Sequence, residues 1–431
     1  MKKTIVILLV LCLLGGAAAG YFYGRGSDAA ESAPQGVIGG ADGPTQILVT
    51  DGDDPAAPEE SPDPAVLPET PAENAPTEPQ VQLVDYEKLY KSHEPDEVIG
   101  SIDGRDVTWS AYCYMLLSEV GSVENYFTQM AGYFGAAPSW DDVADEETGE
   151  SYARIAVENA DNTMLQLTAI RQLAEENGVV LDEEDQAAIG EQLQRDITQA
   201  CGEGATEEDF NAYLESIYLS RDVYDMMNQI SMLYQRGFIQ LYGPQGEKMD
   251  SQEALDWMVD KGYLSCTHIL QMTVDSETGE ELEQDAANEK LATAQRLAEE
   301  LQAIQDPEAL VARFRELKEE YCEDTGKAVY PDGYVFLPGT MVPEFEEATL
   351  ALEDYQVSDP VKTDYGYHVI LRLPLDPDAL IDYSSGGSPM TGRSYAANDA
   401  YARQLQERFE ALELEYAEGF SAPNLTEYLQ G

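Results

Sequence analysis

The stretch "YLSCTHILQM", residues 263–272, decides the fold of the second half of the chain. Its side chains alternate, so that Cys266 and His268 point to one face while Thr267 and Ile269 point to the other. Alternation over this length is typical of a buried β-strand. His268 is one of 3 histidines in the sequence. It is therefore either a core imidazole with a partner or part of a site.

The residues downstream of this strand predict a compact α+β domain. Apolar side chains recur at helical spacing from Ala287 to Ile304, and Asp306 with Pro307 predicts the start of a second helix. A loop, a short strand, a helix from Pro343 and a final strand ending at Leu373 complete the pattern. This order predicts an antiparallel sheet surrounded by helices.

Four segments in this region resemble the parvulin family of peptidyl-prolyl isomerases. They are "CTHIL" in the first strand, "YCEDTG" after the second helix, "PGTMVPEFEEA" around the third helix and "PVKTDYGYHVI" at the last strand. They fall in the family's order and spacing, which implies a parvulin domain over residues 263–374. The resemblance implies isomerisation of X-Pro bonds without a metal or a cofactor.

The resemblance also assigns the candidate site residues of the domain. The two histidines are a hundred residues apart, and in parvulins the corresponding strands are neighbours. The implied catalytic residues are His268, Asp324, His368 and Thr363. The implied substrate-binding residues are Met341 and Phe345, expected on one helical face, and Phe336 as a further wall of the proline pocket.

The chemistry implied by the resemblance needs little beyond shape and polarity. Rotation about an X-Pro bond is opposed by a barrier of about 18–20 kcal/mol, because of amide resonance. An apolar pocket for the proline ring, with polar groups around the twisted amide, favours the transition state over both planar forms. Alternatively, the histidine pair chiefly holds two strands together.

The sequence departs from the family pattern in two places and leaves a disulfide open. Gly333, in "YPDGYVF", stands where a larger apolar side chain often lines the pocket, so we expect a shallower pocket. Residues 262–289 contain no Lys or Arg, so a phosphoserine before proline would be repelled. Cys266 and Cys322 each precede a site residue by two positions, and a disulfide between them is an open alternative.

The middle of the chain, residues 86–262, is predicted to be an all-α domain entered through one short strand. Residues 98–102 predict that strand, and Thr108 is a candidate N-cap for the helix that follows. Residues 163–181 have a helical apolar face, and Thr206 begins a capping-box pattern. This organisation resembles the chaperone region of the SurA and PrsA family.

Residues 375–393 predict a loop, and residues 394–431 predict a C-terminal helix that returns to the chaperone domain. Tyr401, Leu405 and Phe409 share its apolar face, which is expected to continue through Leu412 and Tyr416. The resemblance implies that the parvulin domain is inserted between two parts of the chaperone domain.

The first 85 residues predict an export segment and a tether. Residues 1–25 combine two lysines with an uncharged run long enough to cross a bilayer, so we expect a transmembrane signal anchor, with a cleaved signal peptide as the alternative. Residues 26–85 contain no Lys or Arg and 10 prolines, which is typical of an acidic disordered linker. With 24 basic against 83 acidic residues, the chain is not expected to bind nucleic acid.

We therefore expect an extracytoplasmic prolyl isomerase and chaperone, a foldase that acts on exported polypeptides. The expected location is the cell membrane, with a single pass and the bulk of the chain on the cell surface, or secretion if the signal is cleaved. The expected partners are unfolded or partly folded exported chains, and a homodimer is left open. The alternative is a non-catalytic holdase or surface adaptor that keeps the parvulin fold for client binding.

Overall fold

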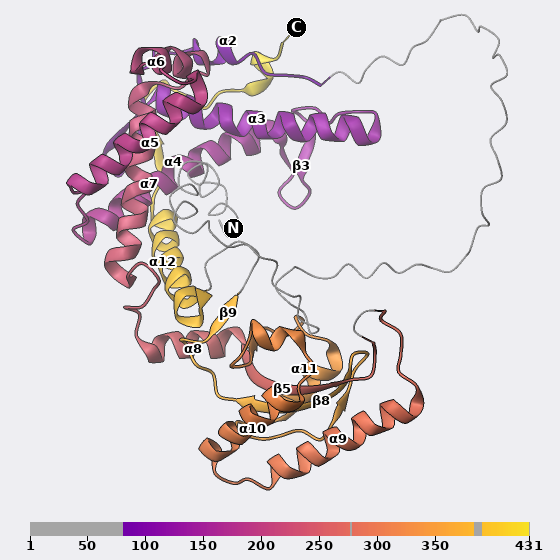
Figure 1. The fold of residues 1–431 in the computed structure, drawn as a ribbon. Helices are drawn as coiled ribbons and strands as arrows, with labels where there is room; N and C mark the ends of the chain where they lie inside the picture. Colours follow the sequence, from indigo (N-terminus) through magenta and orange to yellow (C-terminus); the bar gives the residue numbers. More distant parts are fainter. Residues whose placement is uncertain (1–80, 276–277, 383–389, 431) are drawn as a thin grey trace, which may run out of the picture. The chain divides into compact units, whose positions relative to one another are not determined.

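The described residues form two compact units in a computed structural model (Figure 1). The structure describes residues 81–275, 278–382 and 390–430. The first unit holds residues 81–240 and 401–430, and the second holds residues 241–400. The predicted anchor and residues 26–80 of the predicted linker lie outside the described residues. Within residues 81–275, 278–382 and 390–430, no helix has both the length and the apolarity needed to cross a bilayer.

The first unit is mainly helical. Its helices α3 and α4 pack against each other. Its elements are α2 (Tyr86–Tyr90), β1 (Val98–Ile102), β2 (Arg105–Thr108), α3 (Trp109–Phe134), β3 (Val143–Asp145), β4 (Glu150–Ser151), α4 (Tyr152–Glu176), α5 (Glu183–Cys201), α6 (Glu207–Ser216), most of α7 (Arg221–Tyr242), the second half of α12 (Gly392–Ala411), β11 (Leu414–Tyr416) and η2 (Leu425–Tyr428).

Capping residues in the sequence predicted where some of these helices begin. Thr206 makes the predicted capping box, with its side chain accepting from the Asp209 amide. Thr108 occupies the N-cap position of α3, but its side chain makes no capping hydrogen bond. The linker prediction was wrong at its end, because Val84 is buried and Asp85 caps α2. Folded structure therefore begins before residue 86.

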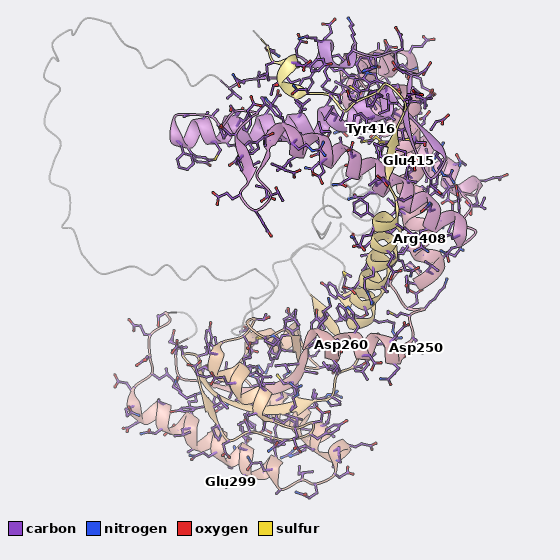
Figure 2. The ribbon with its side chains drawn as sticks, turned by 180° about the vertical axis from the view of Figure 1, so that it is seen from behind. Asp250, Asp260, Glu299, Arg408, Glu415 and Tyr416 are labelled. Atoms are coloured by element: carbon purple, nitrogen blue, oxygen red, sulfur yellow. The ribbon has the colours of Figure 1, made fainter. Side chains whose placement is uncertain are left out.

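The first unit is not all-α, which corrects the sequence prediction. A three-stranded sheet runs in the order β11-β1-β2, and β3 pairs with β4 in a separate hairpin. The C-terminal helix α12 ends at Ala411, and Tyr416 lies on β11 opposite Gly100 of β1. Arg408 on the helix and Glu415 and Tyr416 on the strand are labelled in Figure 2.

Pairing with β1 explains why the predicted helix stops early. The edge of β1 that β2 leaves free needs hydrogen-bond partners, and β11 supplies them. Gly100 permits the close approach, because a Cβ there would lie 2.6 Å from the carbonyl oxygen of Glu415. The hydroxyl of Tyr416 also donates to Asp161 of α4 at 2.6 Å. These contacts lie far apart in sequence, so helical periodicity could not reveal them.

The second unit contains a four-stranded antiparallel sheet in the order β6-β5-β8-β7. Asp306 caps α10 as predicted, by accepting from the Ala309 amide. The elements are α8 (Ser251–Lys261), β5 (Leu264–Met272), α9 (Gln284–Gln302), α10 (Pro307–Tyr321), η1 (Thr325–Ala328), β6 (Tyr334–Phe336), α11 (Pro343–Ala351), β7 (Val361–Lys362), β8 (Gly366–Leu373), β9 (Leu380–Asp382) and β10 (Met390–Thr391).

Helices cover both faces of this sheet (Figure 1). Ile269, Val369 and Leu371 face α9 and α10 in one buried cluster. Cys266 and Ile370 belong to a second cluster, which includes Phe345 of α11. The predicted loop 375–393 is wrong in part, because β9 and β10 pair within it. The first strand and the last long strand of the domain, β5 and β8, lie side by side at the centre of the sheet.

Candidate active site

The two histidines face each other from neighbouring strands. In the β5–β8 register, His268 lies opposite Ile370 and Leu270 lies opposite His368, so the imidazoles are diagonal neighbours on one face. Their Nδ1 atoms are 3.0 Å apart, and their rings are nearly parallel with centroids 5.2 Å apart. Both side chains are fully buried. Antiparallel pairing thus closes the gap of a hundred residues.

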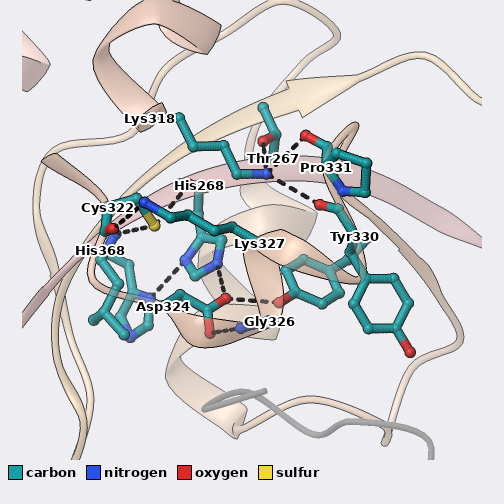
Figure 3. A network of polar contacts seen from close by, with 12 residues as sticks. Thr267, His268, Lys318, Cys322, Asp324, Gly326, Lys327, Tyr330, Pro331 and His368 are labelled. Atoms are coloured by element: carbon teal, nitrogen blue, oxygen red, sulfur yellow. Dashed lines mark hydrogen bonds and ion pairs between the residues drawn. The ribbon is translucent and has the colours of Figure 1, made fainter. Parts of the chain in front are cut away.

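Asp324 anchors the other side of His268 (Figure 3). Its Oδ2 lies 3.0 Å from His268 Nε2, and its Oδ1 accepts from the Gly326 amide at 2.9 Å. The carboxylate is also the N-cap of η1, so local backbone geometry fixes its position. On the far side, the hydroxyl of Thr363 lies 2.8 Å from His368 Nε2. Four of the predicted residues therefore form one continuous hydrogen-bonded chain.

Burial and hydrogen bonding set the protonation states of the side chains in this hydrogen-bonded chain. Burial alone would raise the pKa of Asp324, but hydrogen bonds from His268, Tyr334 and Gly326 outweigh burial and hold this pKa below its usual value. Burial lowers the pKa of His268, and it lowers the pKa of His368 well below the usual value. At neutral pH, the carboxylate is ionised and both imidazoles are neutral.

These charge states fix the direction of each hydrogen bond. An ionised carboxylate can only accept, so His268 donates from Nε2 to Asp324. Its Nδ1 is then an acceptor, and His368 donates to it from Nδ1. The Nε2 atom of His368 accepts from the Thr363 hydroxyl. Each ring nitrogen of the two histidines therefore has a hydrogen-bond partner, and the one negative charge of the hydrogen-bonded chain lies on Asp324.

The three predicted pocket residues lie in one apolar cluster beside the histidines. Phe345 is fully buried, and its ring centroid is 5.4 Å from that of His268 and 5.4 Å from that of His368. Phe336 and Met341 belong to the same cluster. Met341 precedes α11 instead of sharing its face with Phe345, which corrects the sequence prediction. Pro343 begins the helix two residues later, and the loop before it still directs Met341 inward.

Sequence reasoning missed two residues of this region. The hydroxyl of Tyr334, on β6, donates to Asp324 Oδ2 at 2.6 Å, and its ring centroid is 5.5 Å from that of His268. Lys318 is a buried lysine on α10. The sequence contained a signal for Tyr334, since it lies two residues before Phe336 and therefore on the same face of the strand. Lys318 follows Phe314 by four residues, within the apolar stripe of its helix.

Other sequence interpretations are also resolved at this level. Gly333 has φ +118, and a Cβ there would lie 2.3 Å from the carbonyl oxygen of Cys266. The backbone itself therefore occupies the space that a side chain would need.

The disulfide that the sequence left open does not form, because Cys266 and Cys322 are free thiols. His93 is half-buried against Trp109 in the first unit.

Comparison with protein families now adds to this geometry. The family model described as "Rotamase: PPIC-type PPIASE domain" matches residues 268–373. The match runs from His268 through the end of β8, and it contains all four side chains of the hydrogen-bonded chain. This domain is a parvulin-type peptidyl-prolyl isomerase domain.

Curated relatives extend the similarity beyond the domain. Foldase protein PrsA of Oceanobacillus iheyensis is 30% identical over 237 residues, which cover 53% of this chain and 66% of the relative. Foldase protein PrsA of Geobacillus kaustophilus is 55% identical over 58 residues, which cover 13% of this chain and 21% of the relative. The chain therefore spans slightly less than two thirds of the first relative and about a fifth of the second.

A solved structure shows a weaker likeness. The crystal structure of PrsA from Bacillus subtilis is 19% identical, with a TM-score of 0.22, and the match covers 74% of this chain and 92% of that chain. A TM-score this low does not establish a common fold over the whole chain. The similarity to PrsA foldases therefore rests on sequence.

Proposed function

We propose that this chain is an extracytoplasmic prolyl isomerase that assists the folding of exported proteins. The observation that carries the proposal is the buried chain from Asp324 through the two histidines to Thr363, set against the apolar residues Phe345 and Met341. His268, Asp324, His368 and Thr363 are the proposed catalytic residues. Met341, Phe345 and Phe336 are the proposed proline pocket.

The proposed mechanism is electrostatic and needs no covalent step. The apolar cluster holds the proline ring, while the ionised Asp324 and the two neutral imidazoles set the potential beside the X-Pro bond. Twisting the bond removes amide resonance and leaves the nitrogen more basic than in the planar amide. Preorganised dipoles favour that twisted form over both planar forms, and this lowers the rotation barrier.

The chaperone role, the location and the partners belong to the same proposal. We propose a helical chaperone domain of residues 86–262 with the C-terminal segment 394–431, interrupted by the isomerase domain 263–374 and the segment 375–393 that follows it. The similarity to PrsA foldases supports unfolded or partly folded exported polypeptides as clients. Attachment to the cell membrane through residues 1–25, and assembly as a homodimer, are further parts of the proposal.

A protease-coupled assay on proline peptides tests the enzyme proposal. The full chain should accelerate cis-trans isomerisation, and Asp324→Asn should lower kcat/KM by about tenfold or more, because a charged hydrogen-bond acceptor is lost. Asp260→Asn, at an exposed carboxylate on α8 of the same unit, is the matched control and should leave kcat/KM unchanged. Equal activity of wild type and Asp324→Asn would refute the site assignment.

One observation favours the alternative function, a non-catalytic holdase. His268, His368 and Phe345 are fully buried, whereas a catalytic site must admit a substrate. If the full chain suppressed client aggregation without accelerating isomerisation, the holdase would replace the enzyme. Aggregation of a denatured client, followed by light scattering in parallel with the isomerase assay, separates the two functions.

A further inference from the structure

Lys318 is a buried lysine beside the proposed site. Its side chain is 3% exposed. Its Nζ donates to Thr267 Oγ1 at 3.2 Å and to the carbonyl oxygens of Tyr330 at 3.2 Å and Pro331 at 3.1 Å (Figure 3). These three acceptors are neutral. Burying an ammonium group is costly, and an apolar side chain would fill the stripe of α10 without that cost.

The three acceptors show what the ammonium group joins. Thr267 lies on β5, next to His268, whereas Tyr330 and Pro331 lie in the turn that leads from η1 into β6. Lys318 itself comes from α10. One cation therefore ties a helix, the central strand and a turn together. It donates to the carbonyl oxygen of Pro331 and to that of Tyr330, which also accepts from the Gly333 amide.

The turn fixed in this way delivers Tyr334 to the site. Gly333 brings the backbone against Cys266, and Tyr334 then pairs with Cys266 in the β5–β6 register. The ring centroid of Tyr330 is 4.8 Å from that of Tyr334. The Tyr334 hydroxyl reaches Asp324 on the same Oδ2 atom that accepts from His268. A shift of the turn would therefore change the hydrogen bonding of Asp324.

We propose that Lys318 is a positioning residue, which holds the Tyr330–Pro331 turn against β5 and thereby keeps Tyr334 hydrogen-bonded to Asp324. Lys318 acts through Tyr334 and touches no reacting group. The inference rests on the proposed isomerase function for its kinetic readout alone. Its structural readout, the environment of His268, is independent of that function.

Three variants of the full chain test the proposal. Lys318→Met removes the ammonium group and keeps the length of the side chain. Tyr334→Phe removes only the hydroxyl, and the third variant combines the two changes. The measurements are the ¹H–¹⁵N signal of His268 Nε2 and the kcat/KM for a proline peptide.

Both single variants should shift the His268 Nε2 signal in the same direction and lower kcat/KM by about tenfold, because Asp324 loses a charge-assisted hydrogen bond. The double variant should be no worse than the lower single variant, since both changes remove the same contact. Lys318→Arg, which keeps the charge and the donors, should restore part of the loss.

An unchanged His268 signal in Lys318→Met would overturn the proposal, and so would additive effects in the double variant. If Lys318→Met fails to fold, the pair Lys318→Met with Thr267→Val removes the ammonium group together with its one side-chain acceptor and is read in the same way. If the wild-type chain proves inactive, the isomerase proposal fails, and the His268 signal still decides the role of Lys318.

Discussion

At the scale of the residue, the central property of the site is a neutral imidazole pair next to an ionised carboxylate. Burial lowers the pKa of His268 and of His368, so the folded chain resists protonation at these positions. The unfolded chain takes up protons at both positions below a pH of about 6.5. The pair therefore links the stability of the isomerase domain to pH.

The stability of the domain should fall as the pH falls from about 7 to about 5. A histidine with a lowered folded-state pKa stabilises the fold fully above its unfolded pKa, and this stabilisation is lost as protons favour the unfolded chain. Each histidine contributes a slope of up to about 1.4 kcal/mol per pH unit in this range. Denaturant unfolding of the full chain, followed by methyl signals of Ile269 and Val369, measures the slope.

Two variants assign the slope to the site. His368→Asn should reduce it by about half, because one of the two lowered groups is gone. His93→Gln changes the histidine of the other unit and should leave the slope unchanged. Equal unfolding free energies at both ends of the pH range would contradict the neutral-pair assignment.

At the scale of the element, the approach of β6 to β5 shapes the site. Gly333 precedes β6 with φ +118, in the region that favours glycine. The absence of a Cβ lets the turn press against Cys266 of β5. This contact and the Lys318 hydrogen bonds fix the same turn from two sides. These contacts hold the short strand β6 in place against β5.

Gly333→Ala should lower the free energy of unfolding of the domain by at least about 2 kcal/mol, from backbone strain and a forced separation of β5 and β6. Gly339→Ala is the matched control, because Gly339 also has a positive φ, +88, but open space around its Cβ position. The control should lose only about 1 kcal/mol. Chemical denaturation of both variants gives the difference, and equal losses would show that the close approach costs nothing.

Element boundaries show where local sequence signals were sufficient and where they were not. The caps of α10 and α6 were predicted because capping depends on residues three or four positions apart. The strand β11 was missed because its partner β1 lies about three hundred residues away in sequence. Met341 was misplaced because its inward direction comes from a loop.

At the scale of the whole molecule, the dominant property is its negative charge. The formal net charge of −59 creates a negative electrostatic potential around the protein, which any approaching client meets. Such a field slows the approach of anionic segments and speeds the approach of cationic ones, and its effect decreases with salt. Selectivity among X-Pro segments should therefore depend on the flanking charges as well as on the pocket.

Peptides with phosphoserine, glutamate or lysine before proline test this selectivity. At low ionic strength, kcat/KM for the phosphoserine peptide should lie at least about tenfold below that for the lysine peptide, because the phosphate carries up to two negative charges. Raising the ionic strength to about 1 M should shrink the ratio towards one. A preference for phosphoserine at either salt concentration would contradict the prediction.

The sequence by itself determined the family of the isomerase domain, the order of its elements and the candidate site residues, because strand alternation, helix caps and short motifs are local. Only the tertiary structure decided that His268 and His368 share one hydrogen bond, that Tyr334 joins Asp324, and that Lys318 supports the turn between them. Each of these contacts joins residues on different elements. The antiparallel register and the approach of β6 set these distances, and no local pattern encodes them.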